Sequence, residues 1–253
     1  MINRKLTPQI EAFKQLKITP QNMTKADFLK YGTLLPYFVT AKDLNEDITA
    51  DQLRIVILAG YASTARSFSS LVSILFQDKH SHILSKVQEI AVNCKNFAEF
   101  REQAYPQAIM NEMWRLHSPI EHMIRTNEED MILHDGSFVP KGTYMDVNSR
   151  WAHEFNSIWG NGENEPSSLY DPEKMLRVMN DSSIDKDMKQ LRTFSGGLRS
   201  CPGEYFAKTE VLLLLYVLTK KQCQLKIVGE PQLIERSLRG LVCEFQISNF
   251  VAM

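Results

Sequence analysis

Apolar side chains occur along this chain in blocks, and the spacing within the blocks predicts helices first and strands later. Residues 53–65 are apolar on nearly every side, which is typical of a helix buried in a protein core. The preceding TADQ segment at 49–52 fits a capping box, so we expect this helix to begin there and to reach about Phe76. Gly60 in its interior costs about 1 kcal/mol relative to alanine, which suggests that another group approaches closely there.

The other elements follow from shorter patterns. Amphipathic or apolar spacing predicts helices at residues 82–92, 97–117 and 204–220. Between residues 120 and 147 the pattern changes to short strands, with a hairpin turn at Asp135-Gly136. The remaining segments predict short helices at 1–48, irregular chain at 148–193, and two or three short strands after residue 220. The predicted fold class is therefore mainly α with a small β part.

The chain has 253 residues and a formal net charge of −1, and these values exclude several classes of protein. Its 43% hydrophobic and 23% charged residues are typical of a globular protein rather than a disordered one. The pI of about 6.6 gives no sign of a basic surface, so we expect no nucleic-acid partner. No apolar run is long enough to cross a bilayer, and the N-terminus lacks the apolar region of a signal peptide, so we expect no membrane span.

The four cysteines do not form a pattern that holds zinc or a disulfide framework. They are Cys94, Cys201, Cys223 and Cys243, and no two of them form a C-x-x-C pair. A disulfide framework would be unusual in a chain of this length with so few cysteines. We therefore expect a reducing compartment, or at least no reliance on disulfides.

Cys201 stands apart because it lies in the glycine-rich sequence FSGGLRSCPG at residues 194–203, just before a helical run. A helix start offers free N–H groups and a positive dipole end, and both stabilise a thiolate. A thiolate is a soft metal ligand, and haem iron is one metal that uses it singly. An isolated cysteine is most often a small buried hydrophobe, but the surrounding residues favour a ligand.

The pattern F-x-x-G-x-R-x-C-x-G resembles the cysteine loop of the cytochrome P-450 family, the haem-thiolate monooxygenases. The resemblance implies that haem is the cofactor, that Cys201 is its axial thiolate ligand, and that Phe194 covers the sulfur. It further implies that Arg199 pairs with a haem propionate and that Gly203 lets the next helix approach the porphyrin. Arg125 resembles a strand arginine that pairs with a propionate, although an ordinary exposed arginine is the alternative.

Glu112 and Arg115 resemble the E-x-x-R helix of the same family, where the pair has a structural role. The spacing places both side chains on one helix face, and a weak surface ion pair is the alternative. The family adds a third basic residue, and Lys174 stands where an arginine is usual. Lysine cannot form the same planar bidentate contact, so we expect this triad to be weakened or rearranged.

The AGYAST sequence at residues 59–64 resembles the family's oxygen-activation stretch, A-G-x-[DE]-T-T. Ala62 occupies the acidic position, and Ser63 replaces the first threonine. Proton delivery during oxygen activation needs a hydroxyl or a water chain near the metal, so Ser63 and Thr64 are the candidate catalytic residues. The alternative is that these hydroxyls only bond back to helix carbonyls.

The resemblance runs from about residue 46 to the C-terminus, in a chain about half as long as a typical member. It implies the C-terminal, haem-binding half of the fold as a single partial domain at 1–253. In that domain residues 1–48 form a helical lead-in and residues 49–253 carry the motifs. Without the helices of the other half, apolar surface of the 50–76 helix would face water.

The implied function is a haem-dependent monooxygenase that inserts one oxygen atom from dioxygen into a small lipophilic substrate, with electrons from a reductase or a ferredoxin. One alternative is a catalytically inactive, truncated haem-thiolate protein or binding remnant, which the short length, Lys174 and Ala62 favour. Another is a haem-thiolate isomerase or dehydratase that does not use dioxygen. We expect an intracellular location, cytoplasmic for the chain as it stands and at the endoplasmic-reticulum membrane if a preceding part carries an anchor.

Overall fold

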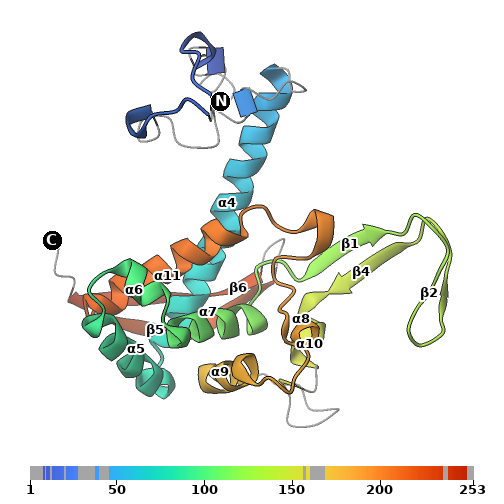
Figure 1. Ribbon diagram of the computed structural model, residues 1–253. Helices are drawn as coiled ribbons and strands as arrows, with labels where there is room; N and C mark the ends of the chain where they lie inside the picture. Colours follow the sequence, from blue (N-terminus) through green and yellow to red (C-terminus); the bar gives the residue numbers. More distant parts are fainter. Residues whose placement is uncertain are drawn as a thin grey trace. The chain divides into compact units, whose positions relative to one another are not determined.

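A computed structural model describes residues 8, 10–11, 13–19, 21–27, 38–39, 46–155, 158–159, 169–235 and 239–249. The chain divides into two compact units, Met1–Ala62 and Ser63–Met253, and each is described by itself. Helices dominate the described part, and its strands form three two-stranded sheets (Figure 1). This confirms the predicted fold class, mainly α with a small β part, whereas the single partial domain stays a prediction.

Helix α4 (Glu46–Leu75) is the long apolar helix, and it begins earlier than predicted. Thr49 lies inside the helix and is 2% exposed, so the predicted capping box does not mark its start. A Cβ added at Gly60 would meet no atom within 4 Å, so the expected close approach is not observed among the described residues.

The part of α4 in the first unit exposes most of its apolar side chains. Ile55 is 58% exposed, Leu58 62% and Tyr61 76%, whereas Leu53 packs against Ile10. The prediction of a buried helix is therefore wrong for this stretch. The exposure agrees with our expectation that apolar surface of this helix would face water.

Residues 48–75 of α4 are long and apolar enough to cross a membrane, judged by length and composition. Each apolar run in this helix is too short to cross a bilayer, but the runs follow one another closely and together meet the criterion. A core helix of a soluble protein meets the same criterion, so the expected absence of a membrane span stays a prediction.

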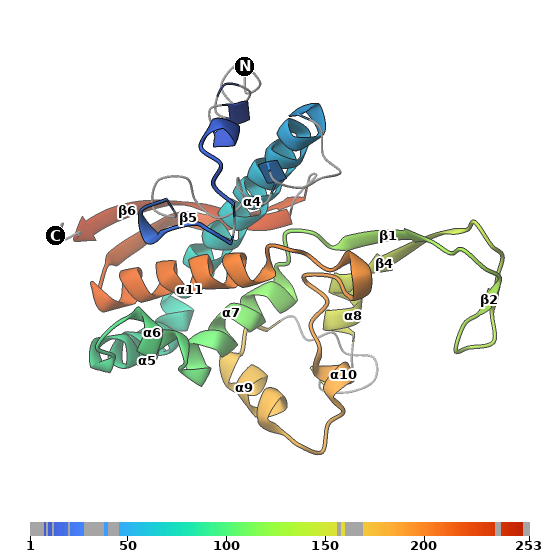
Figure 2. The same ribbon diagram turned by 45° about the horizontal axis from the view of Figure 1, so that its top comes forward.

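The larger of two hydrophobic clusters in the described part of the second unit joins several helices. It joins the last turns of α4 to α5 (Ser81–Asn93), α7 (Ala104–Leu116) and α11 (Glu204–Lys220). Figure 2 shows α11 lying alongside α7 and α6 (Phe97–Arg101). The helices predicted at 82–92 and 204–220 are confirmed. The side chains of this cluster that are at most 1% exposed are Leu71, Leu75, Val87, Ala91, Phe100, Ile109, Met113, Val211 and Leu215.

The helix predicted at 97–117 is interrupted, because α6 ends at Arg101 and α7 begins at Ala104. Pro106 accounts for the break. Its ring cannot follow a continuous helix, since it lacks an N–H and clashes with the carbonyl four residues earlier, but it is tolerated in a first turn. Asn96 caps α6 by accepting the backbone N–H of Glu99 at 3.0 Å.

The strands form antiparallel pairs. Asp135-Gly136 makes the predicted hairpin turn, with Gly136 at φ 87°. Figures 1 and 2 show the hairpin that contains this turn extending away from the helices, with β2 (Met131–Ile132) at its far end. The last two strands are longer than the short strands we predicted. The pairs are β1 (His122–Thr126) with β4 (Tyr144–Asn148), β2 (Met131–Ile132) with β3 (Phe138–Val139), and β5 (Gln224–Glu235) with β6 (Arg239–Asn249).

The segment predicted to be irregular, 148–193, contains three short helices. Each begins at a side chain that accepts a backbone N–H: Asn148, Asp171 or Asp185. These are preferred N-cap residues, and a proline follows Asp171 at the first helical position. Part of the segment, residues 156–157 and 160–168, lies outside the described residues. The helices are α8 (Ser149–Glu154), α9 (Pro172–Asn180) and α10 (Lys186–Lys189).

Candidate functional site

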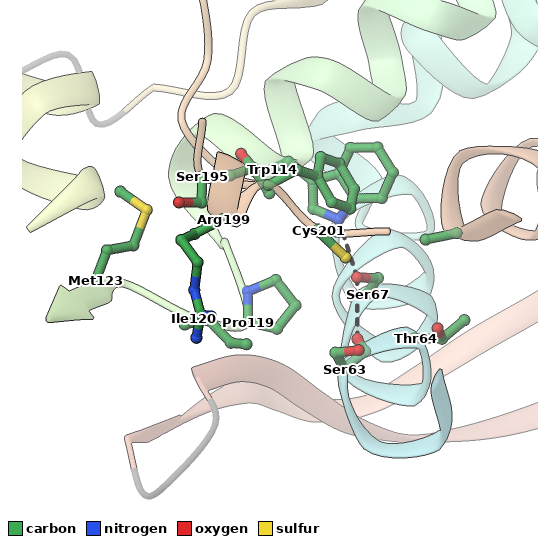
Figure 3. Close-up of a pocket in the computed structure, with 13 residues that line it drawn as sticks. Ser63, Thr64, Ser67, Trp114, Pro119, Ile120, Met123, Ser195, Arg199 and Cys201 are labelled. Carbon is green, nitrogen blue, oxygen red and sulfur yellow. Dashed lines mark hydrogen bonds between the residues drawn. The ribbon is translucent and has the colours of Figure 1, made fainter. Parts of the chain in front are cut away.

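Five of the predicted site residues line one cavity of about 160 Å³ in the second unit. Figure 3 shows Ser63 and Thr64 on α4, and Arg199 and Cys201 on the cysteine loop, around this cavity. Phe194 also lines it. Residues more than 130 positions apart in the sequence are therefore brought to the same space.

The cysteine loop presents its sulfur to the outside. Residues 196–202 are all exposed, and they include the short helix η2 (Gly197–Arg199). The Cys201 N–H donates to the Phe194 carbonyl at 2.9 Å, which closes the loop before α11 begins. A Cβ added at Gly203 would lie 3.8 Å from Cys201 Sγ, so this glycine adjoins the sulfur.

Two arginines flank the loop from different elements. Arg199 belongs to the loop, lines the cavity, and has no hydrogen-bond partner among the described residues. Arg125 comes from β1 and donates to Ser195 Oγ at 2.6 Å and to the Ile124 carbonyl at 2.9 Å. Guanidinium groups are well suited to carboxylates, so these two side chains can hold acidic groups of a ligand.

The α4 side of the cavity carries hydroxyl groups. Thr64 is 8% exposed and Ser67 is 3% exposed. Ser67 donates to the Ser63 carbonyl at 3.1 Å and accepts the indole N–H of Trp114 at 2.9 Å. No sequence motif pointed to Ser67 or Trp114 as residues of this site. Ser67 follows Ser63 by one helical turn, so the spacing could have pointed to it, whereas its contact with Trp114 is long-range.

Glu112 and Arg115 form a bidentate ion pair inside the protein. Arg115 Nε donates to Glu112 Oε2 at 2.7 Å and Arg115 Nη2 to Oε1 at 2.8 Å, with both residues at most 2% exposed. Arg115 also donates to the carbonyls of Leu169 and His153, at 3.3 and 3.5 Å. The pair thus ties α7 to α8 and to the chain before α9, unlike an exposed surface pair.

Lys174, the predicted third basic residue, donates through Nζ to the Trp159 carbonyl. The backbone N–H of Asp171 donates to Glu112 Oε1 at 3.1 Å. Asp171 also accepts the Lys174 N–H at 2.8 Å, which starts α9. The start of α9 therefore supplies a hydrogen bond to the buried carboxylate.

His153 fixes the chain that enters the cysteine loop. Its Nε2 accepts the backbone N–H of Arg192 at 2.8 Å, and its Nδ1 has no hydrogen-bond partner among the described residues. Burial lowers the pKa of His153 to about 4, so the ring is neutral at neutral pH.

The side chains around the cavity fit a haem. Cys201 and Arg199 line the cavity, and Arg125 bonds to Ser195 in its lining, so a haem would find one soft ligand and two cations for its carboxylates here. Thr193 Oγ1 is buried in the cavity wall with no hydrogen-bond partner among the described residues, so it can serve a polar group of a ligand. The cavity is smaller than the roughly 300–1,000 Å³ typical of drug-sized ligands, so it can enclose only part of a macrocycle.

Comparisons with known proteins agree on one family. The family model for cytochrome P-450 matches residues 12–240. Ganoderic acid synthetase of Ganoderma lucidum is 28% identical over 198 residues, covering 69% of this chain and 35% of that protein. Cytochrome P-450 4F8 of Homo sapiens is 24% identical over 219 residues, covering 84% of this chain and 40% of that protein. The chain thus spans between a third and two fifths of the length of these relatives.

A solved structure has the same fold. The crystal structure of a cytochrome P-450 superposes with a TM-score of 0.76 at 17% sequence identity. The match covers 98% of this chain and 56% of that one. At this identity, the likeness concerns the fold alone.

Proposed function

This chain belongs to the cytochrome P-450 family, and from that premise we propose that it takes part in a haem-thiolate monooxygenase reaction. In this reaction one oxygen atom from dioxygen enters a small lipophilic substrate. The observation that carries the proposal is the shared cavity, in which Cys201 and the hydroxyl residues Ser63 and Thr64 meet. A haem, when bound, would supply the oxygen-activating chemistry.

The cysteine side of the cavity would hold the haem. Cys201 would ligate the iron through its thiolate, and Phe194 would shield the sulfur from water. Arg199 and Arg125 would bind the two propionates. Gly203, next to the sulfur, would leave room for the macrocycle at the start of α11.

The α4 side would handle protons. Ser63 and Thr64 line the cavity and would hold a proton near the reacting atoms. Ala62 provides no carboxylate behind them, so water would have to complete the proton path. Pro119, Ile120 and Met123 add apolar surface to the same cavity, which suits a lipophilic substrate.

The partners follow from the chemistry. The reaction consumes electrons, so a reductase or a ferredoxin would supply them. An intracellular location is part of the same proposal.

Haem titration of the purified chain, followed by oxygen uptake with a reductase and a lipophilic substrate, tests the proposal. We expect stoichiometric haem binding, substrate-dependent oxygen consumption and an oxygenated product. A chain that binds no haem would contradict the proposal, and so would a haem-loaded chain that forms no oxygenated product with any reductase. The second result would favour the inactive haem-thiolate protein.

Ala62 favours one second candidate, a haem-thiolate isomerase or dehydratase that rearranges an already oxygenated substrate. Such an enzyme needs no acid for dioxygen activation. It would convert a hydroperoxide substrate without a reductase and without consuming oxygen. The same loaded protein therefore distinguishes the two reactions in one oxygen-electrode experiment.

A further inference from the structure

Trp114 touches both walls of the cavity. It lies on α7 between Glu112 and Arg115, is 2% exposed, and lines the cavity together with Ser67 and Phe194. The proposed function assigns no role to Trp114 or Ser67. Their contacts nevertheless link the hydroxyl residues of α4 to the cysteine loop, and the proposed function needs both.

The first contact of Trp114 reaches α4. Its indole N–H donates to Ser67 Oγ at 2.9 Å, and Ser67 donates to the Ser63 carbonyl at 3.1 Å (Figure 3). An indole has one donor and no acceptor, so this bond satisfies the only polar group of the side chain. A buried N–H left without an acceptor is costly, so the bond fixes α4 against α7 beside Ser63.

The second contact of Trp114 reaches the cysteine loop. Its ring meets the Phe194 ring edge-on, with centroids 5.0 Å apart and an interplanar angle of 86°. Edge-to-face pairs have a preferred geometry and add attraction beyond the area that they bury. The Phe194 carbonyl accepts the Cys201 N–H at 2.9 Å. Phe194 therefore links the Trp114 ring to the backbone of Cys201.

Trp114 is itself held in place by its neighbours on α7. The bidentate Glu112–Arg115 pair flanks it in the sequence and anchors this turn of the helix to α8 and to the chain before α9. The backbone that carries the indole is therefore held in place between α4 and the cysteine loop.

We propose that Trp114 is a positioning residue that sets the placement of the α4 hydroxyls relative to Cys201. The Ser67 bond locates the α4 wall and the Phe194 contact locates the cysteine loop. The catalytic meaning of this placement rests on the proposed function, but the placement itself is a property of the chain without haem.

The test uses amide hydrogen exchange in the full chain without haem. Ser67→Ala and Trp114→Phe each remove the hydrogen bond, and Trp114→Phe keeps an aromatic ring against Phe194. Trp114→Leu removes both contacts. Trp151→Phe is the matched control, because Trp151 is 63% exposed and lies outside the cavity lining.

Ser67→Ala and Trp114→Phe should speed exchange at residues 63–71 about fivefold and leave residues 194–203 unchanged. Trp114→Leu should speed exchange in both segments, while α5 and the control variant keep wild-type rates. Equal acceleration of α5 in Trp114→Leu would show a general loss of stability and overturn the proposal. Unchanged exchange in both segments would overturn it too.

A spectroscopic readout separates this proposal from the proposed function. In haem-loaded protein, Trp114→Leu should lower the fraction of the reduced carbon monoxide complex that shows the red-shifted thiolate band, and Trp151→Phe should not. If the wild-type chain bound no haem, the proposed function would fail, and the exchange pattern would still decide the positioning role. Normal spectra together with unchanged exchange in the Trp114 variants would overturn the positioning role alone.

Discussion

The Glu112–Arg115 pair and the cysteine loop belong to the same unit, but they differ in how the chain surrounds them. Arg115 is 1% exposed and bonds to a carboxylate and to two backbone carbonyls. Residues 196–202 of the loop are all exposed, and Leu198 is 106% exposed. The partners of the ion pair lie within the chain, whereas the loop presents the Cys201 side chain outward. Changes at the pair should therefore weaken folding, and changes at the loop should weaken ligand binding.

Breaking the ion pair should give the largest effect. Arg115→Leu leaves Glu112 as a buried carboxylate without its cation, which typically costs about 3–5 kcal/mol. Urea unfolding of the chain without haem measures this loss. Arg177→Leu is the control, because Arg177 is 69% exposed and lies 3.9 Å from Asp171, so its loss should stay below about 1 kcal/mol. If the two variants lost similar free energies of unfolding, the proposed difference between the buried ion pair and the exposed surface would be contradicted.

The next largest effect should be the pH dependence of folding stability that His153 causes. Burial holds the pKa of His153 at about 4, below its ordinary value of 6.5, so between these values the unfolded chain binds a proton that the folded chain does not. Stability is therefore full above pH 6.5 and falls as the pH falls toward 4, by roughly 3 kcal/mol.

His153→Gln should remove that part of the slope, since an amide does not titrate and its oxygen can still accept the Arg192 N–H. His122→Gln is the control, because the His122 side chain is 59% exposed. Unfolding at a series of pH values measures both variants. If folding stability depended on pH in His153→Gln as it does in the wild type, another group would be the cause of the pH dependence.

Gly203→Ala should have a smaller effect, and this effect should fall mainly on ligand binding by the cysteine loop. A Cβ there would lie 3.8 Å from Cys201 Sγ, an ordinary contact, so the folded chain should lose at most about 1 kcal/mol at this N-cap position. Haem affinity should fall about tenfold, because the added methyl group occupies space beside the ligand. Parallel urea and haem titrations separate the two quantities. If Gly203→Ala lowered the free energy of unfolding by more than it lowered the free energy of haem binding, the proposed difference between the ion pair and the loop would be contradicted.

The short-range features of this fold could be predicted because neighbouring residues determine them. The Asp135-Gly136 turn and the helix at 204–220 are examples. The break before α7 was also open to prediction from Pro106, and the start of α9 from Asp171 followed by a proline. At the break, local propensity outweighed a longer apolar pattern, and at α9 a local capping signal started a helix in a segment that we predicted to be irregular.

The site could be predicted only as separate motifs. Its sequence patterns identify Cys201 and Arg199, but their convergence with Ser63 depends on how α4 packs against α7 and the loop. The Trp114–Ser67 bond joins residues 47 positions apart, and no local pattern indicates it. The exposure of α4 before Ser63 likewise depends on which elements cover it, and composition does not show that.

The most direct test of the account is the reduced carbon monoxide spectrum of haem-loaded wild-type, Cys201→Ser and Cys94→Ser proteins. Cys94 is a suitable control because it is 4% exposed and lies outside the cavity lining. We predict the red-shifted band of thiolate ligation in the wild type and in Cys94→Ser, and its complete loss in Cys201→Ser. A thiolate band that persists in Cys201→Ser, or equal spectra for the two variants, would contradict the assignment of Cys201 as the haem ligand.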